Sequence, residues 1–170
     1  MTGRRPVVRR IRWLDRAMSS ETMRETTRQA GHRVVVAQVT EAPISTIEHE
    51  QAVAVLAAGA VVGFGGIVRD HDHGRTVTEL EYTGHPSAGE VLAEIAAEFA
   101  ARDGVEAIAV SHRVGPLRLG DTALACAVST AHRAEAFALC GELVDAVKAR
   151  IPIWKRQVFE DGTDEWVACP

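Results

Sequence analysis

Only two of the 19 lysines and arginines in the sequence are lysines, Lys148 and Lys155. An arginine guanidinium keeps its positive charge in a protein, whereas a lysine ammonium group can lose its proton. Burial or a neighbouring cation makes that loss easier. The two lysines are therefore candidates for a base, a nucleophile or a proton donor. On residue counts alone, two lysines that persist by chance in an arginine-rich chain also explain the pattern.

A second group of basic residues, His132 and Arg133, is expected in the first turn of the last long helix. Positive charges there oppose the helix dipole, so their placement has a cost. A bound phosphate or carboxylate would offset this cost, because a first turn also presents free amide N–H groups. The pattern therefore indicates an anion site, with a solvent-exposed pair as the alternative. Arg69 and His112 are further basic residues at the ends of predicted strands.

The spacing along this helix constrains how these residues can cooperate. His132 and Lys148 are sixteen positions apart, which corresponds to roughly 24 Å along a straight helix. One subunit is therefore not expected to bring both to one small ligand, and a shared site would be composite, across a dimer interface. Lys148 follows Val144 by one helical turn, at the edge of the apolar stripe, so we expect its amine to be partly buried.

Other possible sites carry weaker signals. The glycine-rich run at 63–66 lacks the residues of a phosphate loop or a dinucleotide fold. His71, Asp72 and His73 are consecutive loop residues without a distant partner, so we expect no metal site, and nothing in the sequence indicates a cofactor. The three cysteines have no C-x-x-C spacing and are expected to be reduced thiols in a cytoplasmic protein.

Composition and length favour one soluble domain with a basic extension. The chain is 46% hydrophobic and 25% charged, and no apolar run is long enough to span a membrane. Residues 1–32 are rich in arginine, whereas the remainder is acidic enough to bring the net charge to −4. A basic arm can touch nucleic acid or a membrane surface. We expect a poorly ordered extension instead, without nucleic-acid or membrane partners, followed by one domain over 33–170.

Apolar patterns and turn signals predict three helices and seven strands. The helices are expected between Ser45 and Gly59, over 86–102 and over 131–150, the last capped by Thr130 and stopped by Pro152. Strands are expected at 33–39, 60–69, 77–83, 105–112, 122–128, 153–159 and 165–168. The last two should form a small C-terminal hairpin. This order indicates an α+β fold with helices packed on mixed or antiparallel sheet.

Several stretches, in this order along the chain, resemble the catalytic (large) subunit of molybdopterin synthase, the MoaE family. They are Gly59 to Arg69, His112 to Gly115, Ser129 to Phe137, Lys148 to Lys155 with its Pro-Ile-Trp-Lys, and Asp161-Gly162 before Trp166-Val167. The resemblance implies an α/β hammerhead fold and a homodimer within a heterotetramer. Each subunit would bind a small ubiquitin-like sulfur-carrier subunit. The C-terminal Gly-Gly thiocarboxylate of this carrier would supply the sulfur with which the enzyme converts cyclic pyranopterin monophosphate to molybdopterin, by forming its dithiolene.

The resemblance also implies roles for individual residues. Lys148 and Lys155 would be catalytic, and the substrate would be bound by Arg69, His132, Arg133, Arg156, Gln157, Ile67 and Val68. Two positions depart from the family pattern, because Gln157 and Thr83 stand where a Glu is frequent. A non-catalytic module that binds a ubiquitin-like partner or an anionic nucleotide is the alternative. The lysine pair favours the enzyme, since a passive anion site can be built from arginine alone.

Overall fold

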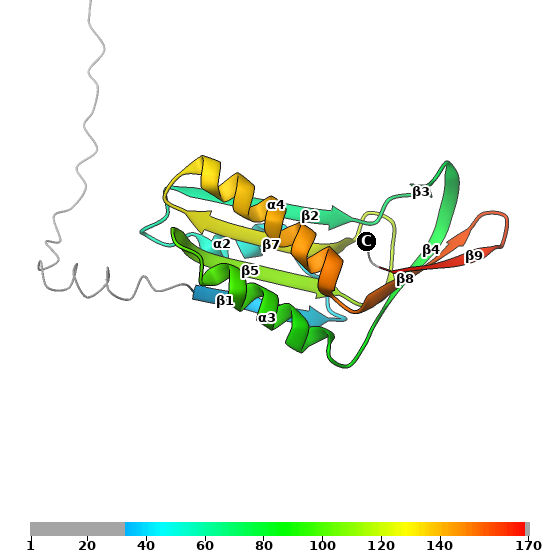
Figure 1. Cartoon of the computed structure of the whole chain (residues 1–170). Coiled ribbons are helices and arrows are strands. Elements are labelled where there is room, and N and C mark those ends of the chain that lie inside the picture. The colour runs from blue at the N-terminus through cyan, green and yellow to red at the C-terminus, as the bar shows by residue number, and fades with distance from the viewer. Residues whose placement is uncertain (1–32, 169–170) are drawn as a thin grey trace, which may run out of the picture.

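A four-stranded mixed sheet forms the centre of the computed structural model, which describes residues 33–168 (Figure 1). Its strands, in spatial order, are β1 (Arg33–Thr40), β5 (Val105–Arg113), β7 (Thr122–Thr130) and β2 (Ala60–Ile67). β1 runs parallel to β5, and the other two pairings are antiparallel. Because β5 and β7 lie in the middle and are covered on both faces, nearly all their residues are buried, and their central residues are apolar.

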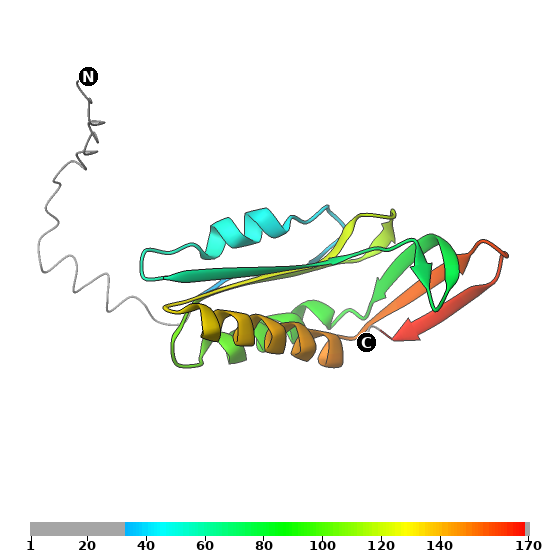
Figure 2. The same ribbon diagram turned by 90° about the horizontal axis from the view of Figure 1, so that it is seen from above.

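Three helices cover the two faces of this sheet, as Figure 2 shows from above. α2 (Thr46–Val53) lies on one face, and α3 (Ala88–Ala100) and α4 (Arg133–Arg150) lie side by side on the other. The larger core lies under α3 and α4 and includes Leu92, Ile95, Ile108, Leu143 and Val147. The sheet under α2 presents mainly alanine, and Gly63 and Gly65 there face the side chains of Glu50 and Thr46. These small residues let α2 approach the sheet closely.

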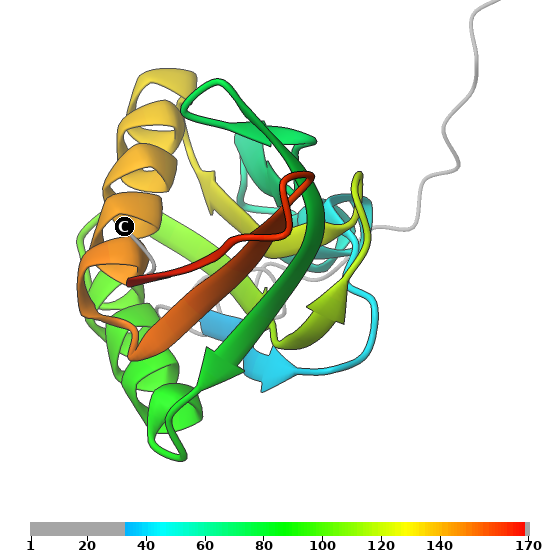
Figure 3. The same cartoon turned by 90° about the vertical axis from the view of Figure 1, so that its right-hand side faces the viewer.

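A second sheet extends beyond the end of the first (Figures 1 and 3). It contains β3 (His71–Asp72), β4 (Arg75–Gly84), β8 (Ile153–Phe159) and β9 (Asp164–Ala168), with β6 (Gly115–Leu117) also paired to β4. All its pairings are antiparallel. The chain passes from α4 into β8 through Ile151 and Pro152 alone, so the end of α4 is tied directly to the second sheet.

The predicted α+β class and the C-terminal hairpin around Gly162 are confirmed. The helix predicted between Ser45 and Gly59 is correct at its start, where the Ser45 side chain accepts a hydrogen bond from the Glu48 amide. Its predicted end is wrong, because α2 stops at Val53. Residues 54–58 are all apolar, but Leu56 is 97% exposed and only Val55 packs against the core, so burial does not extend the helix over this stretch.

Three further expectations need correction. Thr130 does not cap α4: it is the last residue of β7, its hydroxyl donates to the His132 carbonyl, and His132 is the N-cap residue. Residues 70–75, expected as a polar loop, form a tight hairpin between β3 and β4. Its turn uses positive φ at His73 and Gly74. Residues 115–117, for which no strand is expected from the sequence, pair with β4 as β6.

The basic extension predicted over residues 1–32 lies outside the described residues and stays a prediction. None of the helices within 33–168 is long and apolar enough to cross a membrane.

Candidate active site

A cavity of about 300 Å³ lies where the end of the first sheet meets the second sheet. It is lined by Gly66, Ile67, Val68, Arg69, His71, Asp72, Val77, Leu80, Tyr82, His112, Ala123, Leu124, Lys148, Lys155 and Gln157. These residues come from both sheets and from the last turn of α4. The cavity therefore depends on the long-range packing of elements that are distant in sequence.

Both lysines line this cavity, and they reach it from different elements. Lys148 extends from the last turn of α4, on the half-buried edge of the helix. Lys155 extends from β8, and its side chain is 17% exposed. The two residues stand on either side of Ile151 and Pro152, which turn the chain from helix to strand. The sequence prediction that these amines belong to one site agrees with this placement, while their catalytic role stays a prediction.

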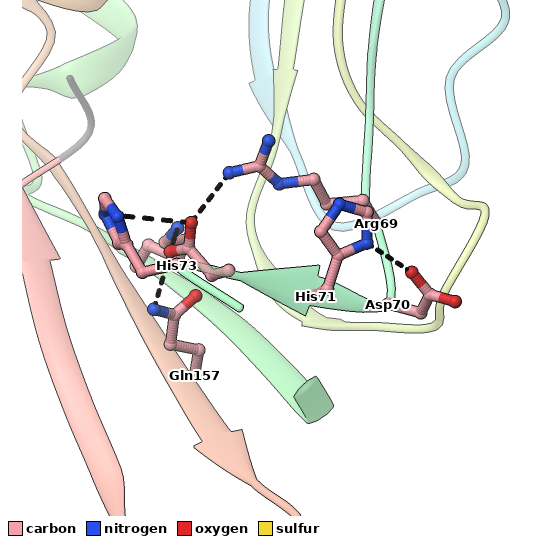
Figure 4. Close-up of polar contacts among 7 residues, drawn as sticks. Arg69, Asp70, His71, His73 and Gln157 are labelled. Atoms are coloured by element: carbon pink, nitrogen blue, oxygen red, sulfur yellow. Dashed lines mark hydrogen bonds and ion pairs between the residues drawn. The ribbon is translucent and has the colours of Figure 1, made fainter. Parts of the chain in front are cut away.

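The buried carboxylate of Asp72 connects several cavity residues. One oxygen, Oδ1, accepts a hydrogen bond from Arg69 at 2.7 Å. The other, Oδ2, accepts from Gln157 at 2.8 Å and from Lys155 at 3.2 Å. Figure 4 shows these polar contacts, with Arg69 and Gln157 approaching from different sides and His73 close by. A buried carboxylate needs such partners, because an unpaired charge away from water is costly.

The same contacts determine the protonation of Asp72. The hydrogen bond from Gln157 lowers the pKa of the Asp72 carboxyl, and the contacts with Lys155 and Arg69 lower it further. Burial opposes these effects but does not outweigh them, so the pKa lies far below its ordinary value of 3.8. Asp72 is therefore a carboxylate at neutral pH.

His112 ends the buried part of β5 and also lines the cavity, with 2% of its surface exposed. Burial lowers the pKa of this imidazole, and the positive charge of Lys148 lowers it further, while the Arg113 carbonyl acts in the opposite direction. A neutral ring donates from Nδ1 to that carbonyl at 2.8 Å. The ring also makes an edge-to-face contact with Tyr82, with centroids 5.1 Å apart. His112 is thus a neutral, rigidly held neighbour of Lys148.

The structure gathers only part of the predicted set of site residues. Ile67, Val68, Arg69, Lys148, Lys155 and Gln157 line one cavity. Arg156 does not, because alternate residues of a strand face opposite sides; it forms an ion pair with Asp164 at 2.9 Å on the outer face of the second sheet.

His132 and Arg133 lie outside the cavity as well. They are exposed at the start of α4, at the end of that helix opposite to Lys148. Within one chain, therefore, the predicted anion site and the lysine pair are separate. Any binding of substrate by His132, Arg133 or Arg156 stays a prediction.

The sequence of this chain also matches a known protein family. The family described as MoaE protein matches residues 39–150, which is more than half of the chain. The chain belongs to the MoaE family. The resemblance inferred from the motifs is thereby confirmed.

Named relatives of this MoaE chain include bacterial and plant proteins called molybdopterin synthase catalytic subunit. A Nostoc sp. relative is 37% identical over 132 residues, covering 76% of this chain and 80% of that protein. An Arabidopsis thaliana relative is 37% identical over 120 residues, and this chain spans 61% of its length. The crystal structure of molybdopterin synthase from Staphylococcus aureus has a TM-score of 0.69 at 33% identity, covering 76% of this chain and 94% of that chain.

Asp72 and His112 are among the cavity residues of this MoaE chain that the sequence does not assign to the site. Asp72 was set aside as part of a polar loop, although the adjacent His73-Gly74 is a turn signal that could have revealed the β3–β4 hairpin. His112 was recognised as a basic residue at a strand end, but nothing in its spacing placed it beside Lys148. Among residues 33–168, no group of three or more His, Cys, Asp or Glu side chains could hold a metal ion.

Proposed function

We propose that this MoaE chain is the catalytic subunit of a molybdopterin synthase and transfers sulfur to cyclic pyranopterin monophosphate. The observation that carries this proposal is the meeting of the two lysines in one cavity, beside a buried carboxylate. Two amines with different surroundings can divide the work of stabilising charge and moving protons. The names of the relatives support the same activity.

The proposed sulfur donor is the C-terminal Gly-Gly thiocarboxylate of a small ubiquitin-like carrier subunit. Its extended tail would enter the cavity between the two sheets, where Gly66 and Ile67 form part of the wall. After the sulfur has bonded to the substrate, water would attack the acyl carbon of the tail, the C–S bond would break and the tail would leave as a carboxylate. Negative charge develops on the carbonyl oxygen of the tail in the tetrahedral intermediate of this step. An ammonium group fixed in a partly buried cavity stabilises such charge better than a water-exposed group does.

The proposed binding site for the substrate phosphate is composite. Arg69 lines the cavity and has a side chain that is 64% exposed, so its guanidinium can reach a ligand at the rim. His132 and Arg133 would come from the second chain of a homodimer, because sixteen helical residues separate His132 from Lys148 in its own chain. We place this dimer within a heterotetramer with two carrier subunits. A cytoplasmic location fits the reduced, buried Cys126 and Cys140.

The test is conversion of cyclic pyranopterin monophosphate by the purified chain and thiocarboxylated carrier. We expect Lys148→Ala and Lys155→Ala each to lower the rate by at least about 100-fold, because each removes an amine from the cavity. Arg150→Ala is the matched control: Arg150 is also a cation in the last turn of α4, but it pairs with Glu98 outside the cavity. It should keep the wild-type rate.

Full activity in either lysine variant would remove this mechanism. Carrier binding without any product from the wild-type chain would instead indicate the non-catalytic binding module.

A further inference from the structure

The strongest unexplained feature of the cavity is the position of Asp72. It is an acidic residue, 7% exposed, at the edge of a site expected to bind an anionic substrate and an anionic tail. A carboxylate there is unfavourable for the binding of both ligands, so we expect it to have another role in the site. The contacts of Asp72 indicate what that role is.

The two oxygens of Asp72 divide their contacts between two parts of the site. Oδ1 accepts from Arg69, and the ring of His73 lies 4.0 Å from the same oxygen. Oδ2 accepts from both Lys155 and Gln157. These last two residues are i and i+2 on β8, so they project from the same face of that strand. Asp72 thus bridges two neighbouring side chains of β8.

This bridge is less exposed than the surface ion pairs among residues 33–168. The side chains of Asp72 and Lys155 are only 9% and 17% exposed, whereas the paired Arg102 and Glu142 are 39% and 58% exposed. A mostly buried pair is screened little by solvent and salt. The amide of Gln157 adds a neutral donor that keeps the carboxylate in place without adding another charge. Asp72 therefore acts on Lys155 more strongly than a surface partner would.

The two lysines differ in their ion pairing. Lys148 forms no ion pair with any residue of the described chain, whereas Lys155 is held by one. A free lysine side chain samples many rotamers and loses this freedom when it is fixed. A side chain that is already fixed before the ligands arrive does not need to be ordered during the reaction.

We propose that Asp72 is a positioning residue that holds the Lys155 ammonium group fixed and charged at the cavity wall. Lys148 then remains as the mobile amine of the pair. This inference rests on the sulfur-transfer function proposed above. It assigns Gln157 the task of orienting Asp72 and makes the β3–β4 hairpin part of the catalytic apparatus.

The absence of other lysines allows a direct test at single-residue resolution. Limited modification with an amine-reactive reagent, followed by peptide mass spectrometry, reports Lys148 and Lys155 in the same sample. In Asp72→Asn we expect the modification ratio of Lys155 to Lys148 to rise about tenfold at constant pH, because a charge-assisted hydrogen bond is lost. In the sulfur-transfer assay, kcat should fall by a similar factor while the KM for the cyclic pterin changes much less.

Asp161→Asn is the matched control, since Asp161 is also paired with an arginine, Arg75, but lies outside the cavity. It should leave the modification ratio and kcat unchanged. An unchanged ratio in folded Asp72→Asn would overturn the proposal even if the wild-type chain is an active synthase. If Asp72→Asn does not fold, the wild-type chain decides: Lys155 must react more slowly than Lys148, and equal rates refute the proposal.

The two proposals fail in different ways. A wild-type chain that makes no product removes the sulfur-transfer function, while the modification ratio can still show that Asp72 fixes Lys155. An active wild-type chain with an unaltered ratio in Asp72→Asn removes only the role of Asp72.

Discussion

Individual residues decide how the cavity holds charge. Asp72 stays ionised because three donors surround it, and His112 stays neutral because it is buried close to Lys148. The two side chains thus provide one fixed negative charge and no additional positive charge. Lys148 and Lys155 remain the cationic groups nearest to the inner part of the cavity, with Arg69 at its rim.

Asp72 should also make the folded state sensitive to acid. Its pKa is lowered on folding from 3.8, chiefly by the hydrogen bond from Gln157. The stabilisation is therefore fully present above about pH 4 and is lost as the pH falls through the lower folded value. We expect the urea midpoint of the wild-type chain to fall with acidification below about pH 4, and that of Asp72→Asn to fall less steeply. Identical slopes for the two proteins, measured by circular dichroism, would contradict this.

Elements meet at a few positions where only glycine fits. Gly59 precedes β2, and its amide donates to the Thr130 carbonyl at the end of β7. A Cβ added at Gly59 would lie 2.1 Å from the backbone oxygen of Ala131. The start of β2 is thereby joined closely to the turn that leads into α4.

Gly59→Ala should consequently destabilise the fold by roughly 2–4 kcal/mol, since the backbone of one segment must move. Gly141→Ala is the control, and we expect it to change the stability in the opposite direction. Gly141 lies within α4 with open space around it, and alanine there should stabilise the fold by about 0.5–1 kcal/mol. Chemical unfolding of both variants measures the difference. Equal stability of the two would show that the approach to Ala131 is not a constraint.

Local sequence signals predict the elements of this chain better than their meeting points. The β-branched run of β1, the Ser45 cap of α2 and the Gly162 turn are visible in a few consecutive residues. Asp72 and Gln157, by contrast, are 85 positions apart and meet only because β4 pairs with both β3 and β8. No local pattern encodes that pairing, so the buried carboxylate was not predicted, whereas the lysine pair was.

At the scale of the whole molecule, the cavity lies beside the last turn of α4, whereas His132 and Arg133 lie at the start of that helix. Figure 1 shows the full length of α4 between these two ends. A site that uses both must therefore combine two chains. This arrangement predicts that defects at the two ends can complement each other when two variant chains form a mixed dimer.

Mixing His132→Ala with Lys148→Ala chains should restore about one quarter of the wild-type rate. Random pairing makes half of the dimers mixed, and each mixed dimer contains one intact site out of two. Mixing Lys148→Ala with Lys155→Ala should restore nothing, because both lysines line the cavity of the same chain. The conversion assay after mixing and re-equilibration measures both cases. Equal recovery in the two mixtures, or none in the first, would exclude the composite site.

Strand β8 separates two surfaces that are only one residue apart in sequence. Lys155 and Gln157 face the cavity, whereas Trp154, Arg156 and Val158 face the opposite side, where Trp154 is 42% exposed. Substitutions on the outward side therefore leave the side chains of β8 that line the cavity in place. The two surfaces of β8 can accordingly be altered separately, by substitutions at alternate positions of one short segment.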